Sequence, residues 1–220
     1  RGLGDVYKRQ VQYEYNVLDV SEWIYEGSAR FIPSALNPDA SFYTPQSSDR
    51  RSLYIYDAIN YLKHPEETLR DKSYSACIFW RYIYEHYGGM DAIREIFEQI
   101  RADNPSTFEE ELRAIDRALA PRIKDIFINF TLANYLEFSD NPFARDDEYY
   151  QHSECYYENV SIVGDKVWEY TGGELKIDKI WFSDVTKVES YAANYIEVVS
   201  RQKENIAIKI IFNGDQDTEF

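Results

Sequence analysis

Residues 73–101 read SYSACIFWRYIYEHYGGMDAIREIFEQIR, and this stretch decides the fold of the first part of the chain. Its apolar side chains recur every three or four residues, a spacing that places them on one face of an α-helix. The residues on that face in the first half are Ala76, Phe79, Trp80, Ile83 and Tyr87. Two glycines follow, and glycine commonly ends a helix because it tolerates a left-handed backbone. The pattern predicts a helix over 73–87, a stop at Gly88 and Gly89, and a second helix over 90–101.

Similar spacing predicts helices on both sides of this stretch. After Ser21, whose side chain can cap a helix, apolar residues recur at helical intervals until Pro33, and proline ends a helix because it has no N–H to donate. Residues 34–52 are rich in Ser, Pro, Asn and Asp, which favour turns, so we expect a loop there. Ser106 with Glu109 three residues later is typical of a capping box. The further predicted helices are 53–63, one from Ser106 to the residues before Pro121, and 123–136.

The sequence pattern changes after these helices. Residues 139–154 are acidic and irregular, which marks a boundary. Beyond the boundary, β-branched and aromatic residues alternate with polar ones or form short apolar runs, as in strands. The predicted strands are 166–170, 175–182, 195–199 and 206–212. The predicted fold class is therefore α+β, with a helical segment followed by a small antiparallel β domain of sandwich type.

Three regions follow from these patterns. The first ten residues, RGLGDVYKRQ, have no helical or strand period and resemble translated adaptor sequence, so we expect an artefactual or unstructured leader over 1–10. We expect a helical segment over 11–140 and a β domain over 155–220. The last residues, NGDQDTEF, are typical of a turn that awaits another strand. We therefore expect the β domain to be incomplete.

Composition and charge exclude some classes of function. The formal net charge is -15, and the basic residues form no stripe, so a nucleic-acid partner is not expected. The sequence contains no run of about 18 apolar residues, so we expect no membrane span. The two cysteines, Cys77 and Cys155, lie far apart and without metal-ligand spacing, and whether they pair stays open. We expect Cys77 to be a small core residue.

Residues 21–31, SEWIYEGSARF, carry a motif with chemical content. They resemble the W-x-x-E-G-x-A pattern on the second zinc-ligand helix of the gluzincin metallopeptidases. In that family the glutamate is the third zinc ligand, and an upstream HExxH helix supplies two histidines and a general-base glutamate. The resemblance implies that Glu26 is a ligand for Zn²⁺, and that Gly27 lets its helix approach closely.

Further resemblances to secreted bacterial gluzincins lie on both sides of this motif. VQYEYN (11–16) is similar to the sequence that follows HExxH in the longer motif HExxHxxQ, with Gln12 as its glutamine; this register puts HExxH at positions 5–9, which read DVYKR. Residues 73–100 resemble the helix pair Y-x-x-x-L-F-W-R-Y-L-x-x-x-Y-G found downstream of the active site. VESYAANYIEV (188–198) resembles the strand entry of the domain attached to such peptidases. The resemblance implies that the helical segment is the C-terminal part of a gluzincin-like peptidase domain.

Each candidate site residue can also be interpreted without a catalytic or metal-binding role. Glu26 can equally be a solvated helix glutamate. Tyr74 corresponds in the resemblance to a tyrosine that stabilises the oxyanion, but it can also be an aromatic residue at a helix start. Many gluzincins carry an acidic residue four positions after the ligand glutamate to orient a histidine, and that position is Arg30 here. The remaining candidates are His64, His86 and His152, which lack HxxxH or HxH spacing and are expected at the surface or at helix ends.

Two functions remain open on this sequence. The first is a secreted bacterial zinc metallopeptidase, extracellular or at the cell surface, that hydrolyses peptide or protein substrates with metal-activated water. Because one carboxylate cannot hold zinc tightly, we expect the chain as given to be inactive. The alternative is a noncatalytic extracellular surface or carbohydrate-binding protein, in which some of the 20 tyrosines form aromatic binding platforms.

Overall fold

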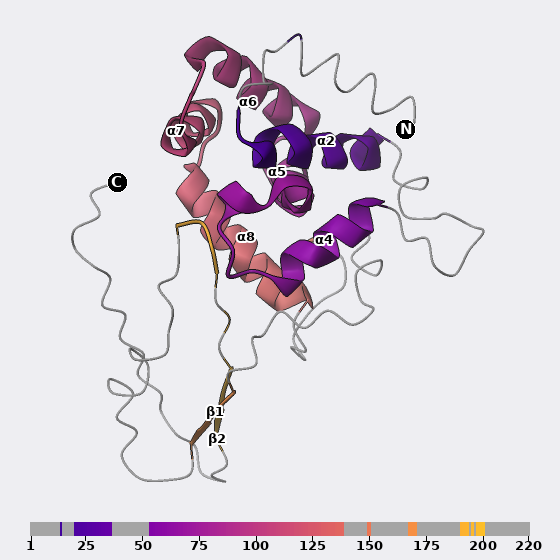
Figure 1. The fold of residues 1–220 in the computed structure, drawn as a ribbon, viewed down its shortest axis with the longest axis vertical. Coiled ribbons are helices and arrows are strands. Elements are labelled where there is room, and N and C mark those ends of the chain that lie inside the picture. Colours follow the sequence, from indigo (N-terminus) through magenta and orange to yellow (C-terminus); the bar gives the residue numbers. More distant parts are fainter. Residues whose placement is uncertain are drawn as a thin grey trace, which may run out of the picture.

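The structure is a computed structural model that describes residues 14, 20–36, 53–138, 149–150, 167–170, 190–193, 195 and 197–200. These residues are mostly helical (Figure 1). The helical elements are α2 (Glu22–Leu36), α4 (Leu53–Lys63), the 3-10 helices η1 (Leu69–Asp71) and η2 (Ser73–Ala76), α5 (Cys77–His86), α6 (Gly89–Asp103), α7 (Phe108–Ala118) and α8 (Ile123–Phe138).

Helix α5 forms the centre of the assembly, with α2, α4, α6 and α8 packed around it (Figure 1). Every residue from Cys77 to Ile83 is buried, so this helix has no solvent side over its first two turns. Aromatic rings fill the space around it: Phe79 meets Phe130 of α8 at 5.1 Å between ring centroids, and Trp80 meets Phe97 of α6 at 6.1 Å. Residues 77–83, which lie in the stretch from which the helical fold is predicted, therefore form the centre of the observed core.

The ends of α5 and α6 follow the glycine signal in the sequence. Helix α5 ends at His86 and α6 begins at Gly89. Gly88 and Gly89 have φ angles of 123° and 66°, which residues with a side chain adopt only with strain. The predicted stop at the glycine pair is confirmed.

Two predicted helix ends are wrong. Helix α2 continues through Pro33 to Leu36, because a proline removes only one helical hydrogen bond and here the buried Phe31 and Ser34 on either side of it hold the last turn in place. The cap of α7 is Thr107, whose hydroxyl accepts from the Glu110 amide at 3.3 Å, while Ser106 donates to the Glu110 carboxylate. The cap therefore lies one residue later than the sequence predicts, at Thr107 with Glu110.

The predicted antiparallel β-sandwich is also wrong. The described residues are mostly helical and contain only the short strands β1 (Val167–Tyr170) and β2 (Glu197–Ser200). These strands pair in parallel, with Val167 opposite Glu197. Alternation in a sequence indicates a strand but not the direction of its partner, and parallel strands need a long connection where antiparallel ones need only a turn. The other predicted strands, 175–182 and 206–212, lie outside the described residues.

Candidate functional site

The site region is the contact between α2 and η2. A Cβ atom at Gly27 would lie 2.9 Å from the Cβ of Ala76 and 3.2 Å from the carbonyl oxygen of Ser73. Real side chains essentially never come as close as the first of these distances, so only glycine fits here without a shift. Gly27 thus allows a close approach of α2 to η2, while the role that the resemblance gives it beside a zinc ligand stays untested.

The tryptophan of the motif forms hydrogen bonds through its indole N–H and its backbone carbonyl. The indole N–H of Trp23 donates to Glu111 Oε2 of α7 at 3.0 Å, and its carbonyl accepts from Trp80 Nε1 at 2.8 Å. The two indole rings stack, with centroids 5.8 Å apart. A buried tryptophan needs a hydrogen-bond acceptor for its indole N–H, and Glu111 supplies it. The two hydrogen bonds also connect α2 to α7 and α5.

Glu111 is a buried carboxylate that sequence reasoning missed. It is 2% exposed, and besides Trp23 it accepts a hydrogen bond from the backbone N–H of Ser21 at 2.6 Å. The signal was available, because Glu111 falls between Phe108, Leu112 and Ile115 on the apolar side of its helix. With both oxygens bonded to groups at the start of α2, its role is to fix the position of that helix.

Glu26 lies on α2 and is half-buried, whereas the other motif residues, Trp23, Gly27 and Ala29, are buried. The motif therefore divides into three packing residues and one carboxylate outside the core. Positions 5–9 lie outside the described residues. The zinc-ligand role of Glu26 accordingly stays a prediction.

Arg30 lies one helical turn after Glu26 and connects three elements. Its guanidinium forms an ion pair with Asp57 of α4, with 2.6 Å between Nε and Oδ2, and lies 4.5 Å from the ring centroid of Tyr74 of η2. Burial raises the pKa of Asp57, and the positive charge of Arg30 opposes this shift. Tyr74 is 38% exposed, and its predicted role as an oxyanion stabiliser stays untested. Tyr74 is part of η2, and α2, the helix that carries Glu26, packs against η2.

The described residues do not fit a zinc ion. They contain no group of three or more His, Cys, Asp or Glu side chains placed to hold a metal. His64 has its Nδ1 3.4 Å from Glu66 Oε1, and His86 at the end of α5 has its Nε2 2.8 Å from the carbonyl oxygen of Tyr149. His152 lies outside the described residues. His64 and His86 occupy the surface and helix-end positions expected of them.

Cys77 is a core residue, as predicted. It is fully buried, and its Sγ lies 3.8 Å from the carbonyl oxygen of Tyr54 in α4. Burial raises the pKa of its thiol well above the ordinary value, which disfavours the nucleophilic thiolate. Cys155 lies outside the described residues.

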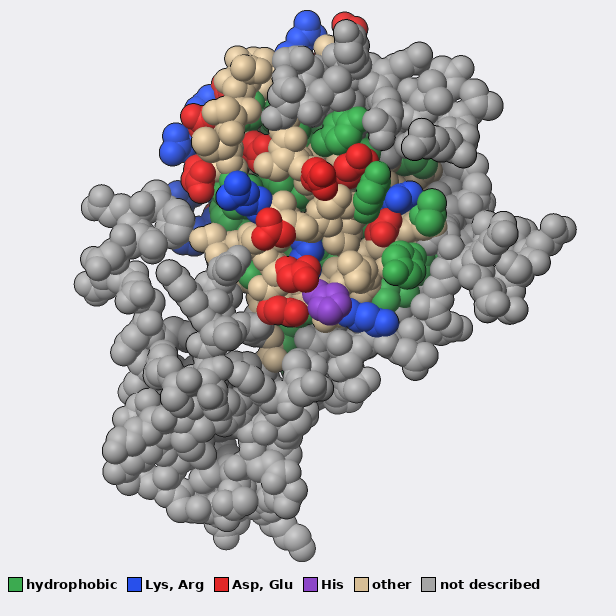
Figure 2. Space-filling view, viewed as in Figure 1, with side chains coloured by type: hydrophobic (Ala, Val, Ile, Leu, Met, Phe, Trp, Pro, Cys, Tyr) green, Lys and Arg blue, Asp and Glu red, His purple; other side chains and the backbone are tan. Residues whose placement is uncertain are grey.

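The surface over the helices carries mixed charge. Figure 2 shows acidic and basic side chains interspersed over the face that includes α2 and α4. Among the described helices, none combines the length and the apolar character that a membrane span requires. Comparison of the chain with protein-family descriptions, curated protein sequences and solved structures finds no match.

Proposed function

We propose that this chain is part of a gluzincin-type zinc metallopeptidase, with Glu26 as the carboxylate ligand of its zinc ion. The observation that carries the proposal is the division of the W-x-x-E-G-x-A motif. Trp23, Gly27 and Ala29 are buried and serve the packing of α2, whereas Glu26 is not needed to fill the core. A zinc ligand has to be placed in this way, on a rigid helix and outside the packed interior.

On this proposal Glu26 is one of the three protein ligands that a catalytic zinc site requires, and the described residues contain no group of three or more possible metal ligands. We therefore derive no catalytic step for them, and the prediction stands that the chain as given does not hydrolyse peptides. The peptidase activity, the peptide substrate and the extracellular location belong to the proposed complete enzyme, whose two histidine ligands would come from an HExxH helix.

A zinc titration tests the proposal. HExxH is restored at positions 5–9, and zinc binding is measured by calorimetry with and without Glu26→Ala. Removing a ligand from a three-ligand site should weaken zinc binding strongly, because the ligands act together on one ion. Glu22→Ala is the matched control, since Glu22 is an exposed glutamate one turn earlier on the same helix. Equal zinc affinities for the restored chain and its Glu26→Ala variant would refute the ligand assignment.

A further inference from the structure

Helix α8 carries apolar residues on its inner and its outer side. On the inner side Ile126, Phe130 and Ala133 are buried in the core. Ile128 and Leu132 lie on the outer side and are 54% and 53% exposed. A surface helix normally carries polar residues on its outer side, and a helix that is apolar all round is normally covered. The outer side of α8 is therefore a surface on which a partner is expected.

A third exposed residue continues this outer side. Tyr135 is 39% exposed and follows Leu132 by three residues, as Leu132 follows Ile128 by four. Residues at these intervals are neighbours along one side of a helix. We call the three residues the α8 stripe, which is about 10 Å long at 1.5 Å per residue. Single exposed apolar residues are ordinary, whereas contiguous apolar surface marks an interaction site.

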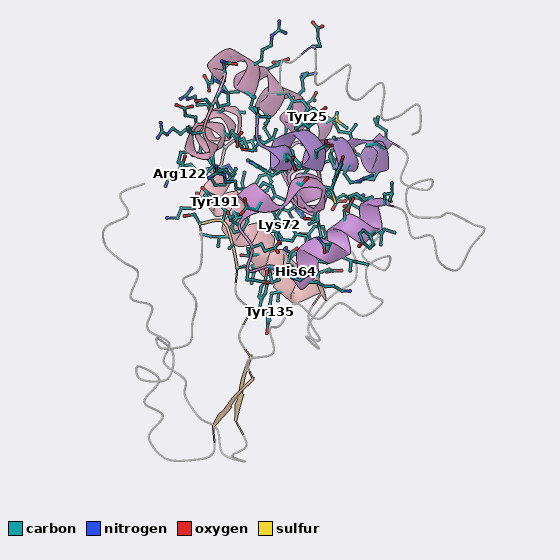
Figure 3. All side chains as sticks on the ribbon, viewed as in Figure 1. Tyr25, His64, Lys72, Arg122, Tyr135 and Tyr191 are labelled. Atoms are coloured by element: carbon teal, nitrogen blue, oxygen red, sulfur yellow. The ribbon has the colours of Figure 1, made fainter. Side chains whose placement is uncertain are left out.

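The C-terminal part of the chain contacts α8 beside this stripe. The ring of Tyr195 stacks on that of Tyr135 with centroids 5.8 Å apart, and its hydroxyl donates to the carbonyl oxygen of Thr131 at 2.7 Å. The ring centroid of Tyr191 lies 5.3 Å from that of Phe127. Figure 3 shows Tyr191 near the start of α8 and Tyr135 towards its other end. Tyr135 thus belongs both to the stripe and to an existing contact with the C-terminal part.

Hydrogen bonds hold this part of the chain against the start of η1. Ser190 and Tyr191 form a turn, in which Tyr191 has a φ of 56°. The carbonyl oxygen of Tyr191 accepts from the amide of Leu69 at 2.8 Å, and that of Ser190 accepts from the hydroxyl of Thr68 at 2.8 Å. The residues that follow Tyr195 therefore start from a fixed place beside α8.

Residues 206–212 form an apolar run after β2. They read IAIKIIF, with Lys209 as the one charged residue, in a chain of which 29% is charged. Burial of such a run removes apolar surface from water, which stabilises a folded chain. Ser200 is five residues from Tyr195 and therefore at most about 18 Å from it, and the six residues from Ser200 to the run can span about 20 Å. The run is thus close enough in the chain to return to α8.

We propose that residues 206–212 of the same chain cover the α8 stripe. This contact enlarges the one that Tyr191 and Tyr195 make with the same helix. The short connection favours the chain's own segment over a second copy, because it gives the segment a high effective concentration. The consequence concerns domain organisation: the C-terminal part is joined to the helices along α8, although the sequence changes character at 139–154. The proposal does not depend on zinc binding.

Thiol alkylation of the full chain tests whether the stripe is covered. Cys155 is replaced by serine, and Cys77 stays because it is fully buried. If residues 206–212 cover the stripe, the thiol of Leu132→Cys should react at least tenfold more slowly than that of Glu95→Cys, an exposed position on α6. Equal rates would overturn the proposal, because Leu132 would then be as accessible as an ordinary surface position.

Aspartate substitutions in the run test whether it is the cover. Ile208→Asp with Ile210→Asp should raise the alkylation rate of Leu132→Cys to that of Glu95→Cys. Lys209→Asp is the matched control, since it places an aspartate in the same run without removing an apolar residue, and the rate should stay slow. A slow rate that the double substitution leaves unchanged would mean that something else covers the stripe and would overturn the proposal.

Disulfide formation identifies the occupant without disrupting the run. Leu132→Cys is paired with a cysteine at each position from 206 to 212 in turn, and the chain is oxidised mildly. At least one pair should form a disulfide within one chain, whereas Glu95→Cys with the same partners should form none. The absence of an intrachain disulfide at every position would overturn the proposal. A disulfide between two chains, with a yield that rises with protein concentration, would assign the stripe to a second copy and overturn occupancy by the same chain.

Discussion

The two sides of α2 differ in what their residues do. On the buried side, Trp23 stacks on Trp80 and bonds to Glu111, and Gly27 lets the helix touch η2. On the other side, Glu26 is half-buried and Arg30 pairs with Asp57 of α4. The buried side therefore accounts for the position of the helix. The other side carries charged groups, of which Arg30 contacts α4 and η2.

This difference explains how a short motif can serve two purposes. A packed tryptophan and a glycine at a close contact fix the axis and rotation of the helix, and the rotation then determines where the glutamate between them lies. Stability and site geometry are thereby coupled through neighbouring residues. If the account is right, substitutions on the two sides of α2 should differ strongly in their effect on the free energy of unfolding.

Trp23→Ala should produce the largest loss. It removes a fully buried indole from between Trp80, Phe79 and Phe108 and leaves the carboxylate of Glu111 without one of its donors. Replacing a buried large aromatic residue by alanine costs about 3–5 kcal/mol. Urea unfolding followed by circular dichroism measures the change. A loss below about 1 kcal/mol would mean that Trp23 does not anchor α2.

Glu111→Ala should produce the next largest loss. It leaves the indole N–H of Trp23 and the amide of Ser21 without their acceptor, and a buried unsatisfied donor costs about 1–3 kcal/mol. Glu109→Ala is the matched control, because Glu109 is exposed in the first turn of the same helix. The comparison of the two sides would fail if both variants were equally stable in the same unfolding experiment.

Gly27→Ala should cost less, because two effects oppose each other. The added methyl group must displace Ala76 or the backbone at Ser73, and overpacking of this kind costs about 1–3 kcal/mol. Alanine also favours a helix over glycine by about 1 kcal/mol, which offsets part of the loss. We expect a net destabilisation in thermal unfolding. A gain in stability would show that α2 and η2 are not in close contact.

The sequence predicted much of the helical part, for identifiable reasons. Helical spacing and the glycine pair located α5 and α6, since Gly88 and Gly89 adopt backbone angles that favour glycine. Pro33 was misjudged because the packing of Phe31 and Ser34 outweighs one lost hydrogen bond. The contacts of residues 190–193 with the helices could not be predicted, because they join segments more than 100 residues apart, such as Thr68 with Ser190.

The candidate site was predictable only in part. The motif pointed to Glu26 and Gly27 on one helix, and the structure explains the glycine through its contact with Ala76. It did not point to Glu111, because Glu111 lies about 90 residues away in the sequence and meets Trp23 and Ser21 only in the folded chain. Nor did it show that Arg30 pairs with Asp57, since a long-range ion pair leaves no local spacing signal.

Glu26→Ala should have the smallest effect, and it tests the central claim most directly. If the buried side of α2 holds the helix, replacing the half-buried Glu26 should change the free energy of unfolding by no more than about 0.5 kcal/mol, because its side chain fills no part of the core. The decisive measurement is urea unfolding of Glu26→Ala beside the wild type and Gly27→Ala. The account predicts that Glu26→Ala unfolds with the wild type while Gly27→Ala unfolds at lower urea concentration. A loss of about 2 kcal/mol or more for Glu26→Ala would show that the carboxylate is structural and would contradict the account.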